Sequence, residues 1–161
     1  MSKLYVRVAE LRAATAGTTL VTVGLGSCVA IVLHDPVSRV GGLAHVLLPS
    51  PALARSASRR LARVPQTAIP AMLAAMTELG ADRRRIQARL AGGASMFANL
   101  VSPGTIQMGE RNLVATRTVL LQHEVPIIAE AVGGDFGRTV TFTIADGRVM
   151  VSSVAHGSRE L

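Results

Sequence analysis

The chain has 161 residues, of which 49% are hydrophobic, and it carries a formal net charge of +7. This length and apolar content fit one domain, expected to span residues 1–161, that buries a core without covalent staples. The single cysteine excludes an internal disulfide bond and a zinc site with several thiolates. The four histidines are scattered without ligand spacing, so neither a metal nor another cofactor is expected.

Arginine supplies almost all of the positive charge, because Lys3 is the sole lysine. A basic balance is typical of proteins with polyanionic partners. However, one Tyr and three Phe are too few for the stacking platforms that single-stranded nucleic acid requires, so no nucleic-acid partner is expected. The arginines are expected to form solvated faces or to steer the protein toward an acidic protein surface. They cluster at Arg55, Arg59, Arg60 and Arg63 and at Arg83, Arg84 and Arg85.

The N-terminal part of the chain predicts strands at residues 4–8 and 20–23, followed by a β-hairpin. Two β-branched or apolar runs, residues 28–33 and 40–47, flank a turn that contains an Asp-Pro step. The sequence therefore predicts two antiparallel strands joined by this turn.

The register of this hairpin decides which side chains meet. If pairing centres between Pro36 and Val37, opposed positions sum to 73, and Cys28 lies directly opposite His45. The apolar residues at 29, 31 and 33 then occupy the other face. A bulge at the Gly41-Gly42 step would instead turn His45 away from Cys28.

The rest of the chain alternates helical and strand patterns. A connection over residues 49–65 is expected at the surface, and apolar spacing predicts helices over 67–79, ended by Gly80, and over 111–123. Their expected core stripes are Ile69, Met72, Leu73, Met76 and Leu79, and Leu113, Val114, Leu120 and Leu121. Strands are predicted at 86–90 and 125–129, with a hairpin of 140–144 and 149–151 around Asp146-Gly147. The pattern indicates a layered α/β domain with mixed, largely antiparallel sheets.

The segment before Cys28 superficially resembles a lipoprotein signal, because basic residues precede an apolar stretch that ends in this cysteine. Glycines and threonines interrupt that stretch, and Glu10 lies in its basic region. No other segment has enough uninterrupted apolar residues to cross a membrane. A cytoplasmic protein without an integral membrane segment is therefore expected.

Cys28 is the candidate nucleophile. The thiolate is the reactive form of cysteine, so it needs a base, and His45 could supply one. Small residues in the turn before Cys28, Gly26 and Ser27, would let backbone N–H groups face a developing oxyanion. Thr22 is a candidate to orient the imidazole. Alternatively, Cys28 is a buried small hydrophobe and His45 an ordinary sheet histidine.

Two glycine pairs, Gly92-Gly93 and Gly133-Gly134, predict sharp turns at strand ends. Loops at such ends often line functional sites, so Gly92, Gly93, Ala94 and Ser95 are candidate substrate-lining residues.

Several blocks closely resemble the chemoreceptor glutamine deamidase family, CheD. They occur in the family's order from near the N-terminus to about Val151. The blocks are Val21-Thr22-Val23-Gly24-Leu25-Gly26-Ser27-Cys28-Val29-Ala30, Gly42-Leu43-Ala44-His45-Val46-Leu47-Leu48-Pro49, Gly92-Gly93-Ala94-Ser95-Met96-Phe97, Gly109-Glu110-Arg111-Asn112, and Gly133-Gly134 with Arg138.

This resemblance implies that Cys28 is the nucleophile, His45 the general base and acid, and Thr22 the third member of the constellation. It implies an α/β sandwich similar to glutamine-deamidating toxin domains. The implied activity is that of a protein-glutamine glutaminase, which hydrolyses glutamine side-chain amides on methyl-accepting chemotaxis receptors through a cysteine thioester. The implied partners are those receptors and the regulatory phosphatase CheC.

Two other functions remain open at this stage. A receptor glutamyl methylesterase would use the same chemistry on a better leaving group. A non-catalytic module would bind the receptor or CheC without turnover.

Overall fold

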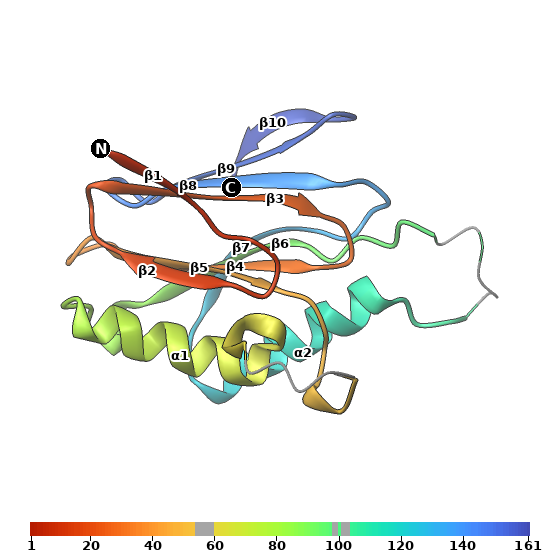
Figure 1. The fold of residues 1–161 in the computed structure, drawn as a ribbon, viewed down its shortest axis with the longest axis horizontal. Coiled ribbons are helices and arrows are strands. Elements are labelled where there is room, and N and C mark those ends of the chain that lie inside the picture. Colours follow the sequence, from red (N-terminus) through yellow and green to blue (C-terminus); the bar gives the residue numbers. More distant parts are fainter. Residues whose placement is uncertain (54–59, 98–99, 101–103) are drawn as a thin grey trace.

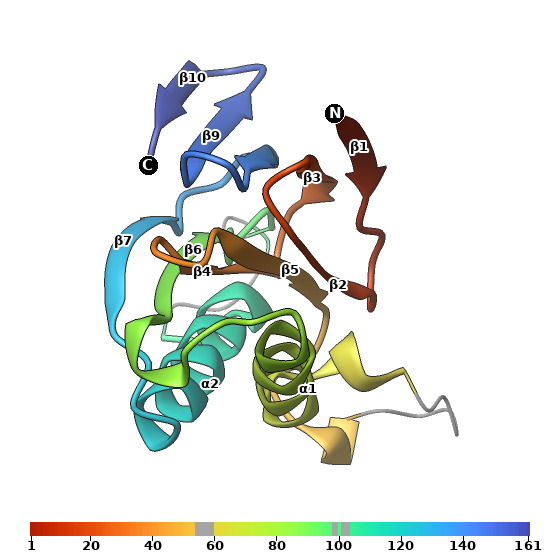
Figure 2. The same ribbon diagram turned by 90° about the vertical axis from the view of Figure 1, so that its left-hand side faces the viewer.

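A computed structural model of the chain describes residues 1–53, 60–97, 100 and 104–161. Over these ranges, two stacked β-sheets are covered on one side by two α-helices (Figure 1). The order of layers is outer sheet, inner sheet and helices, with both helices packed beneath the inner sheet (Figure 2). The predicted layered α/β sandwich is confirmed.

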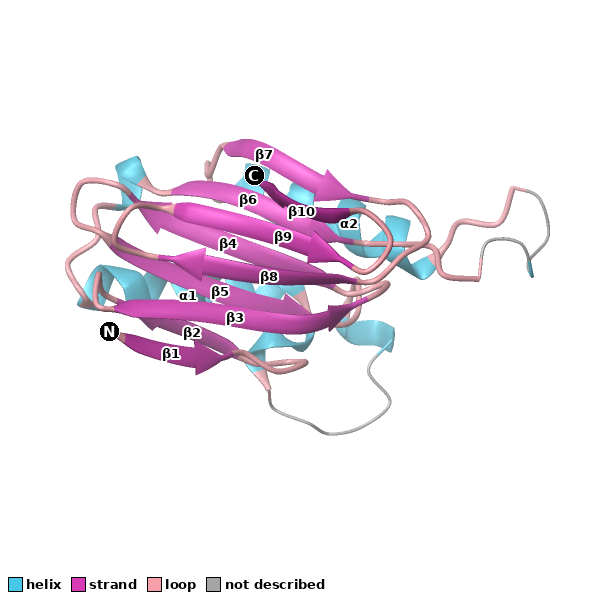
Figure 3. Cartoon of the chain, turned by 90° about the horizontal axis from the view of Figure 1, so that it is seen from above, coloured by secondary structure: helices cyan, strands magenta, loops and turns pink. Residues whose placement is uncertain are grey.

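Both sheets are mixed and largely antiparallel, as predicted (Figure 3). In each sheet, a single pair of neighbouring strands in the described ranges is parallel: β1 with β3 in the outer sheet, and β6 with β7 in the inner sheet. In spatial order, the outer sheet contains β1 (Ser2–Tyr5), β3 (Thr18–Leu25), β8 (Arg138–Thr143), β9 (Arg148–Ser153) and β10 (Gly157–Glu160). The inner sheet contains β2 (Leu11–Ala14), β5 (Val40–Val46), β4 (Val29–Asp35), β6 (Gln87–Gly92) and β7 (Ile127–Val132).

The first helix, α1 (Pro65–Glu78), begins two residues before the predicted start, because Pro65 suits the first helical position, where no N–H partner is needed. Gly80 follows the helix with φ +105°, a conformation that glycine adopts without strain. The predicted stripe is buried except for Leu79, which lies beyond the last turn and is exposed. Short 3-10 helices cover Pro51–Leu53, Leu61–Arg63 and Arg83–Arg85.

The second helix, α2 (Met108–Gln122), turns a different face to the core from the one predicted. Val114 and Leu121 are exposed, whereas Leu113 and Leu120 are buried. The buried face also includes two polar residues, Asn112 and Thr116, at helical spacing. Hydrophobicity alone therefore misplaced part of this face.

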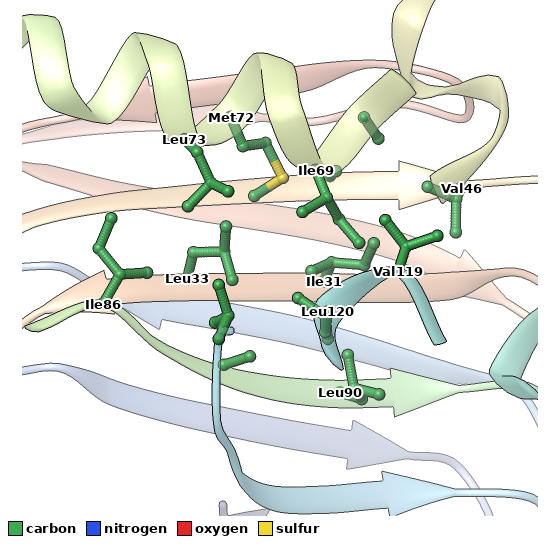
Figure 4. Packing of buried hydrophobic residues seen from close by; sticks show 14 of the residues in the cluster. Ile31, Leu33, Val46, Ile69, Met72, Leu73, Ile86, Leu90, Val119 and Leu120 are labelled. Atoms are coloured by element: carbon green, nitrogen blue, oxygen red, sulfur yellow. The ribbon is translucent and has the colours of Figure 1, made fainter. Parts of the chain in front are cut away.

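Two apolar cores separate the three layers. One fills the space between the inner sheet and the helices, where Ile31 and Leu33 of β4 meet Ile69 and Met72 of α1 (Figure 4). The other lies between the sheets and contains Cys28 together with residues such as Leu20, Phe142 and Val149. Cys28 thus faces the outer sheet and not the helices.

The predicted register of the β4–β5 hairpin is wrong by one residue at the turn. Asp35 pairs with Val40 and Ala30 pairs with His45, so opposed positions sum to 75. The turn closes later because the Asp35 side chain accepts hydrogen bonds from the backbone N–H groups of Val37 and Ser38. Cys28 is therefore not directly opposite His45.

The two side chains still share a face of the inner sheet. Ala30 lies opposite His45, and Cys28 is two residues before Ala30, so alternation directs all three toward the outer sheet. Pairing continues without a shift from Val29 to Asp35, so the strand has no bulge at Gly41-Gly42. A Cβ on Gly41 would come within 2.6 Å of the Phe142 ring, which explains a glycine there by close packing between the sheets.

Asp35 is fully buried and anchors the end of β4. Its carboxylate accepts hydrogen bonds from the Arg85 guanidinium at 3.0 Å and from the Asp82 backbone N–H at 2.8 Å. Burial by itself raises the pKa of Asp35, but the hydrogen bonds from Arg85 and from backbone N–H groups outweigh it and hold that pKa well below its usual range.

We therefore expect Asp35→Asn to lower the free energy of unfolding by about 3 kcal/mol at pH 7, because it removes the buried carboxylate that pairs with Arg85 and leaves this guanidinium only the longer ion pair with Asp82, at 3.4 Å. A carboxyl pKa that is lower in the folded state stabilises the fold above about pH 4 and loses that contribution as the pH falls. Urea unfolding at pH 7 and pH 3 should thus show a smaller pH dependence for Asp35→Asn than for the wild type. The exposed Asp135→Asn serves as a control with the same charge change. Equal effects of the two substitutions would contradict this role of Asp35.

No helix in the described ranges is long and apolar enough to cross a membrane. Of the first arginine cluster, Arg55 and Arg59 lie outside the described residues, as does the middle of the 49–65 connection.

Candidate active site

Thr22 and His45 meet between the two sheets, and Cys28 lies in the same layer. Thr22 lies in β3 of the outer sheet, His45 lies in β5 of the inner sheet, and Cys28 follows the turn that joins the outer sheet to β4. Thr22 and His45 are fully buried, and Cys28 is 8% exposed. The chain passes from the outer sheet to the inner sheet at this turn.

Thr22 and His45 form a direct contact across the two sheets. The Thr22 Oγ1 lies 2.8 Å from the His45 Nδ1 and 2.6 Å from the backbone oxygen of Val6. The hydroxyl has one proton, and the carbonyl of Val6 can only accept, so Thr22 donates to Val6. Thr22 must then accept the Nδ1–H of His45, which fixes the tautomer of the ring.

The other ring nitrogen of His45, Nε2, is left with its lone pair available. It is buried and has no hydrogen-bond partner in the described part of the chain. Burial lowers the pKa of His45 to about 4, so the ring is neutral at pH 7. A buried, neutral imidazole with an unpaired Nε2 has the properties of a general base.

The thiol of Cys28 is also neutral at rest. Burial raises its pKa, and this effect is partly offset by the backbone N–H of Cys28 itself, which favours the thiolate. The resting pair is therefore a thiol and a neutral imidazole. Proton transfer to His45 would accompany nucleophilic attack instead of preceding it.

The turn before Cys28 carries free donors. Within the described ranges, none of the backbone N–H groups of Gly26, Ser27 and Cys28 donates a hydrogen bond to another residue. Met96 lies against this turn, since a Cβ on Gly26 would come within 3.4 Å of its Cγ. The turn can thus present N–H groups to a negatively charged oxygen near the sulfur.

The predicted substrate-lining segment, residues 92–95, packs against the nucleophile turn. The N–H of Gly93 donates to the Cys28 oxygen and the N–H of Ala94 to the Gly26 oxygen, both at 2.8 Å. Gly92 has φ +102°, and a Cβ there would come within 2.3 Å of the Cys28 oxygen. Glycine is required at this position because backbone meets backbone. These residues support the turn, and their contact with substrate stays a prediction.

Asn112 lies in one of the blocks that resemble the CheD family, but the sequence assigned it no role of its own. Its Nδ2 donates to the backbone oxygens of Ser27, at 2.9 Å, and Leu47, at 3.1 Å. It therefore connects the nucleophile turn to the residues just after β5, which carries His45. The usable signal was its position three residues after Gly109, on the same helical face as buried apolar residues.

Replacing Asn112 by Ala should lower the free energy of unfolding by about 2 kcal/mol, because two buried carbonyl groups lose their donor. Urea unfolding of the purified protein measures this effect. Thr116→Val is the matched control, because the buried Thr116 hydroxyl, on the same face of α2, has no partner in the described residues. That substitution should be neutral or slightly stabilising. A larger loss for Thr116→Val than for Asn112→Ala would contradict the assignment.

Comparison with known proteins identifies the family of the chain. The family model described as CheD chemotactic sensory transduction matches residues 47–153, more than half of the chain. The chain belongs to the CheD family. The matched range begins after Thr22, Cys28 and His45, so the family model does not itself bear on those three residues.

Individual CheD relatives extend the similarity over nearly the whole chain. A probable chemoreceptor glutamine deamidase CheD from Archaeoglobus fulgidus is 44% identical over 93% of this chain and 92% of its own. A protein with the same description from Caldanaerobacter subterraneus is 40% identical, with 96% and 94% covered. The chemoreceptor glutamine deamidase CheD of Halalkalibacterium halodurans is 37% identical, with 97% and 96% covered.

Proposed function

We propose that this protein is a protein-glutamine deamidase that converts glutamine side chains of methyl-accepting chemotaxis receptors to glutamate, in chemotaxis adaptation. The observation that carries the proposal is the Thr22–His45 contact, which leaves the Nε2 of a neutral imidazole unpaired on the face that carries the only cysteine. Membership of the CheD family supports the choice of substrate, since relatives are named for chemoreceptor glutamine deamidation.

The first half-reaction forms a thioester. His45 Nε2 accepts the proton of the Cys28 thiol as the sulfur attacks the side-chain carbonyl carbon of the glutamine. The oxygen of the tetrahedral intermediate becomes negatively charged and accepts hydrogen bonds from backbone N–H groups of the turn that includes Gly26 and Ser27. The protonated imidazole then gives its proton to the amide nitrogen, the carbon–nitrogen bond breaks, and ammonia leaves.

The second half-reaction hydrolyses the thioester. His45 Nε2 accepts a proton from a water molecule that attacks the thioester carbon, and the sulfur leaves and recovers this proton. The products are glutamate and the free thiol. The Nδ1–H of the ring donates to Thr22 throughout, and Thr22 donates to the Val6 oxygen. Nε2 therefore acts as base and acid in both halves. The chain's own residues thus supply each proton transfer.

Mass spectrometry of a receptor cytoplasmic fragment tests the proposal. Incubation with the protein should add about 1 Da for each deamidated glutamine, because an amide becomes an acid. A receptor methylesterase would instead remove about 14 Da from a methylated fragment by hydrolysing the ester. An unchanged mass would favour a non-catalytic module that binds the receptor or CheC.

A further inference from the structure

A pocket of about 390 Å³ opens between the loop that follows β7 and the β9–β10 hairpin. Its lining carries positive charge and hydroxyl groups but no acidic residue. The polar and aromatic residues that line it are Phe136, Arg138, Ser152, Ser153, His156 and Arg159.

Arg138 is the buried charge of this pocket. It is 7% exposed, its Nη1 donates to the Gly133 oxygen at 2.8 Å, and its Cζ lies 4.1 Å from the centre of the Phe136 ring. No carboxylate of the described residues forms an ion pair with it. A guanidinium has five N–H donors, and a buried charge is costly without a charged partner. The remaining donors have no partner among the described residues and are not fully enclosed, and Arg138 lines this pocket, so they are available to a ligand there.

The other wall carries a second cation that has no ion pair with any residue the structure describes. Arg159 lies on β10 and lines the same pocket. Burial first, and then the positive charge of Arg159, lower the pKa of Arg138. An anion between the two arginines would relieve this repulsion. Because Val132 and Val151 also line the pocket, a carboxylate on a short aliphatic stem suits it better than a bare ion.

The pocket is connected to the nucleophile turn by backbone hydrogen bonds. The N–H of Gly133 donates to the Gly92 oxygen at 3.0 Å, and the N–H of Ser95 donates to the Gly134 oxygen at 2.8 Å. Gly93 in turn donates to the Cys28 oxygen. A ligand held by Arg138 would therefore lie beside the segment that supports the reactive cysteine.

We infer that this pocket binds a carboxylate side chain of an acidic peptide segment. This inference rests on the function proposed above: the segment belongs to the protein substrate and flanks the target glutamine. The pocket would thereby select glutamines in acidic surroundings, which gives the excess of arginine a specific use.

A binding experiment tests the pocket without requiring turnover. The Cys28→Ala protein, labelled with ¹⁵N, is titrated with the peptide acetyl-Ala-Glu-Glu-Ala-Glu-amide and with its Gln counterpart. We expect saturable shifts of the amides of Gly133, Gly134 and Phe136 with the Glu peptide, and binding of the Gln peptide weaker by about tenfold. Arg159→Gln should weaken binding of the Glu peptide by about tenfold. The exposed Arg12→Gln, on β2 of the other sheet, should leave it unchanged.

Three results would overturn the inference: no shifts at these amides, equal affinity for the two peptides, or equal effects of the Arg159 and Arg12 substitutions. An affinity for free glutarate equal to that for the Glu peptide would also overturn it, because the pocket would then bind a free carboxylate and not a peptide. Arg138→Lys is a further variant, but Arg159 is exposed, so its substitution tests the pocket even where Arg138 is needed for folding.

Kinetics separate this inference from the proposed function. With a receptor cytoplasmic fragment, Arg159→Gln should raise KM by about tenfold and leave kcat within about twofold, because the lost contact is the same in the ground and transition states. If the wild type deamidates the fragment and Arg159→Gln has an unchanged KM, the pocket assignment fails alone. If the wild type shows no deamidation, the proposed function fails, and the peptide titration still decides whether the pocket binds carboxylates.

Discussion

Replacing Cys28 by Ala should abolish receptor deamidation, with a loss of turnover of at least about a thousandfold. Cys28 is the chain's only cysteine, and no other nucleophile is assigned in the mechanism. Without it, water would have to attack an unactivated amide directly. The measurement is the rate at which a receptor fragment gains about 1 Da for each deamidated glutamine.

Two observations make this prediction specific. The Cys28 side chain is small and lies in the core between the sheets, so the loss of one sulfur should leave the protein folded, as urea unfolding can verify. Replacing Ser27 by Ala is the matched control, because it alters the same turn and keeps the thiol. Comparable losses for the two variants would show that the turn's integrity matters, and not the sulfur.

Replacing His45 by Gln should lower turnover by about a thousandfold, because both proton transfers lose their base and acid. Thr22→Val should have a smaller effect, by about tenfold to a hundredfold, since the imidazole stays but its Nδ1–H loses its acceptor. Thr22→Ser keeps the hydroxyl and should recover most of the activity.

The pH profile distinguishes a base from a merely structural histidine. Because burial lowers the pKa of His45 to about 4, kcat/KM of the wild type should stay flat from about pH 7 down to about pH 5 and fall with a midpoint near pH 4. His45→Gln should lose this acid limb. A limb that persists unchanged in the variant would assign it to another group.

The same pKa has a consequence for stability. The pKa of histidine is about 6.5 in the unfolded chain, whereas burial lowers the pKa of His45 to about 4 in the folded protein. Proton binding therefore favours the unfolded state as the pH falls between these two values. Activity below about pH 6.5 should therefore be corrected for the folded fraction.

The sequence was sufficient to predict the layers. It also indicated Cys28, His45 and Thr22 as candidate site residues, whose catalytic roles stay predictions, but it did not predict the register that places them. Two continuous β-branched or apolar runs predicted β4 and β5, and Cys28 and His45 do share a face. The predicted register is wrong by one residue at the turn. The reason is that the Asp35 side chain, and not the Asp-Pro step alone, closes the turn. Such side-chain closure depends on Arg85 and Asp82, which lie far along the chain.

Elements whose stability comes from neighbours were also missed. The strands β2 and β10 are four residues long and lie at sheet edges, and β10 is exposed throughout. Neither has the apolar alternation that reveals a strand, because pairing with β5 and β9 holds them in place. The role of Asn112 was not predicted for a similar reason. Its side chain donates hydrogen bonds to two backbone carbonyl groups that only the fold brings close to it.

The central claim is that the Cys28 sulfur becomes covalently joined to the substrate with loss of ammonia. Acid quenching of a reaction with a glutamine-bearing receptor peptide, followed by intact-mass and peptide mapping, tests it directly. We expect an adduct on Cys28 with the mass of the peptide less about 17 Da, absent from Cys28→Ala. Product formation by Cys28→Ala at the wild-type rate, with no adduct on the wild-type cysteine, would contradict it.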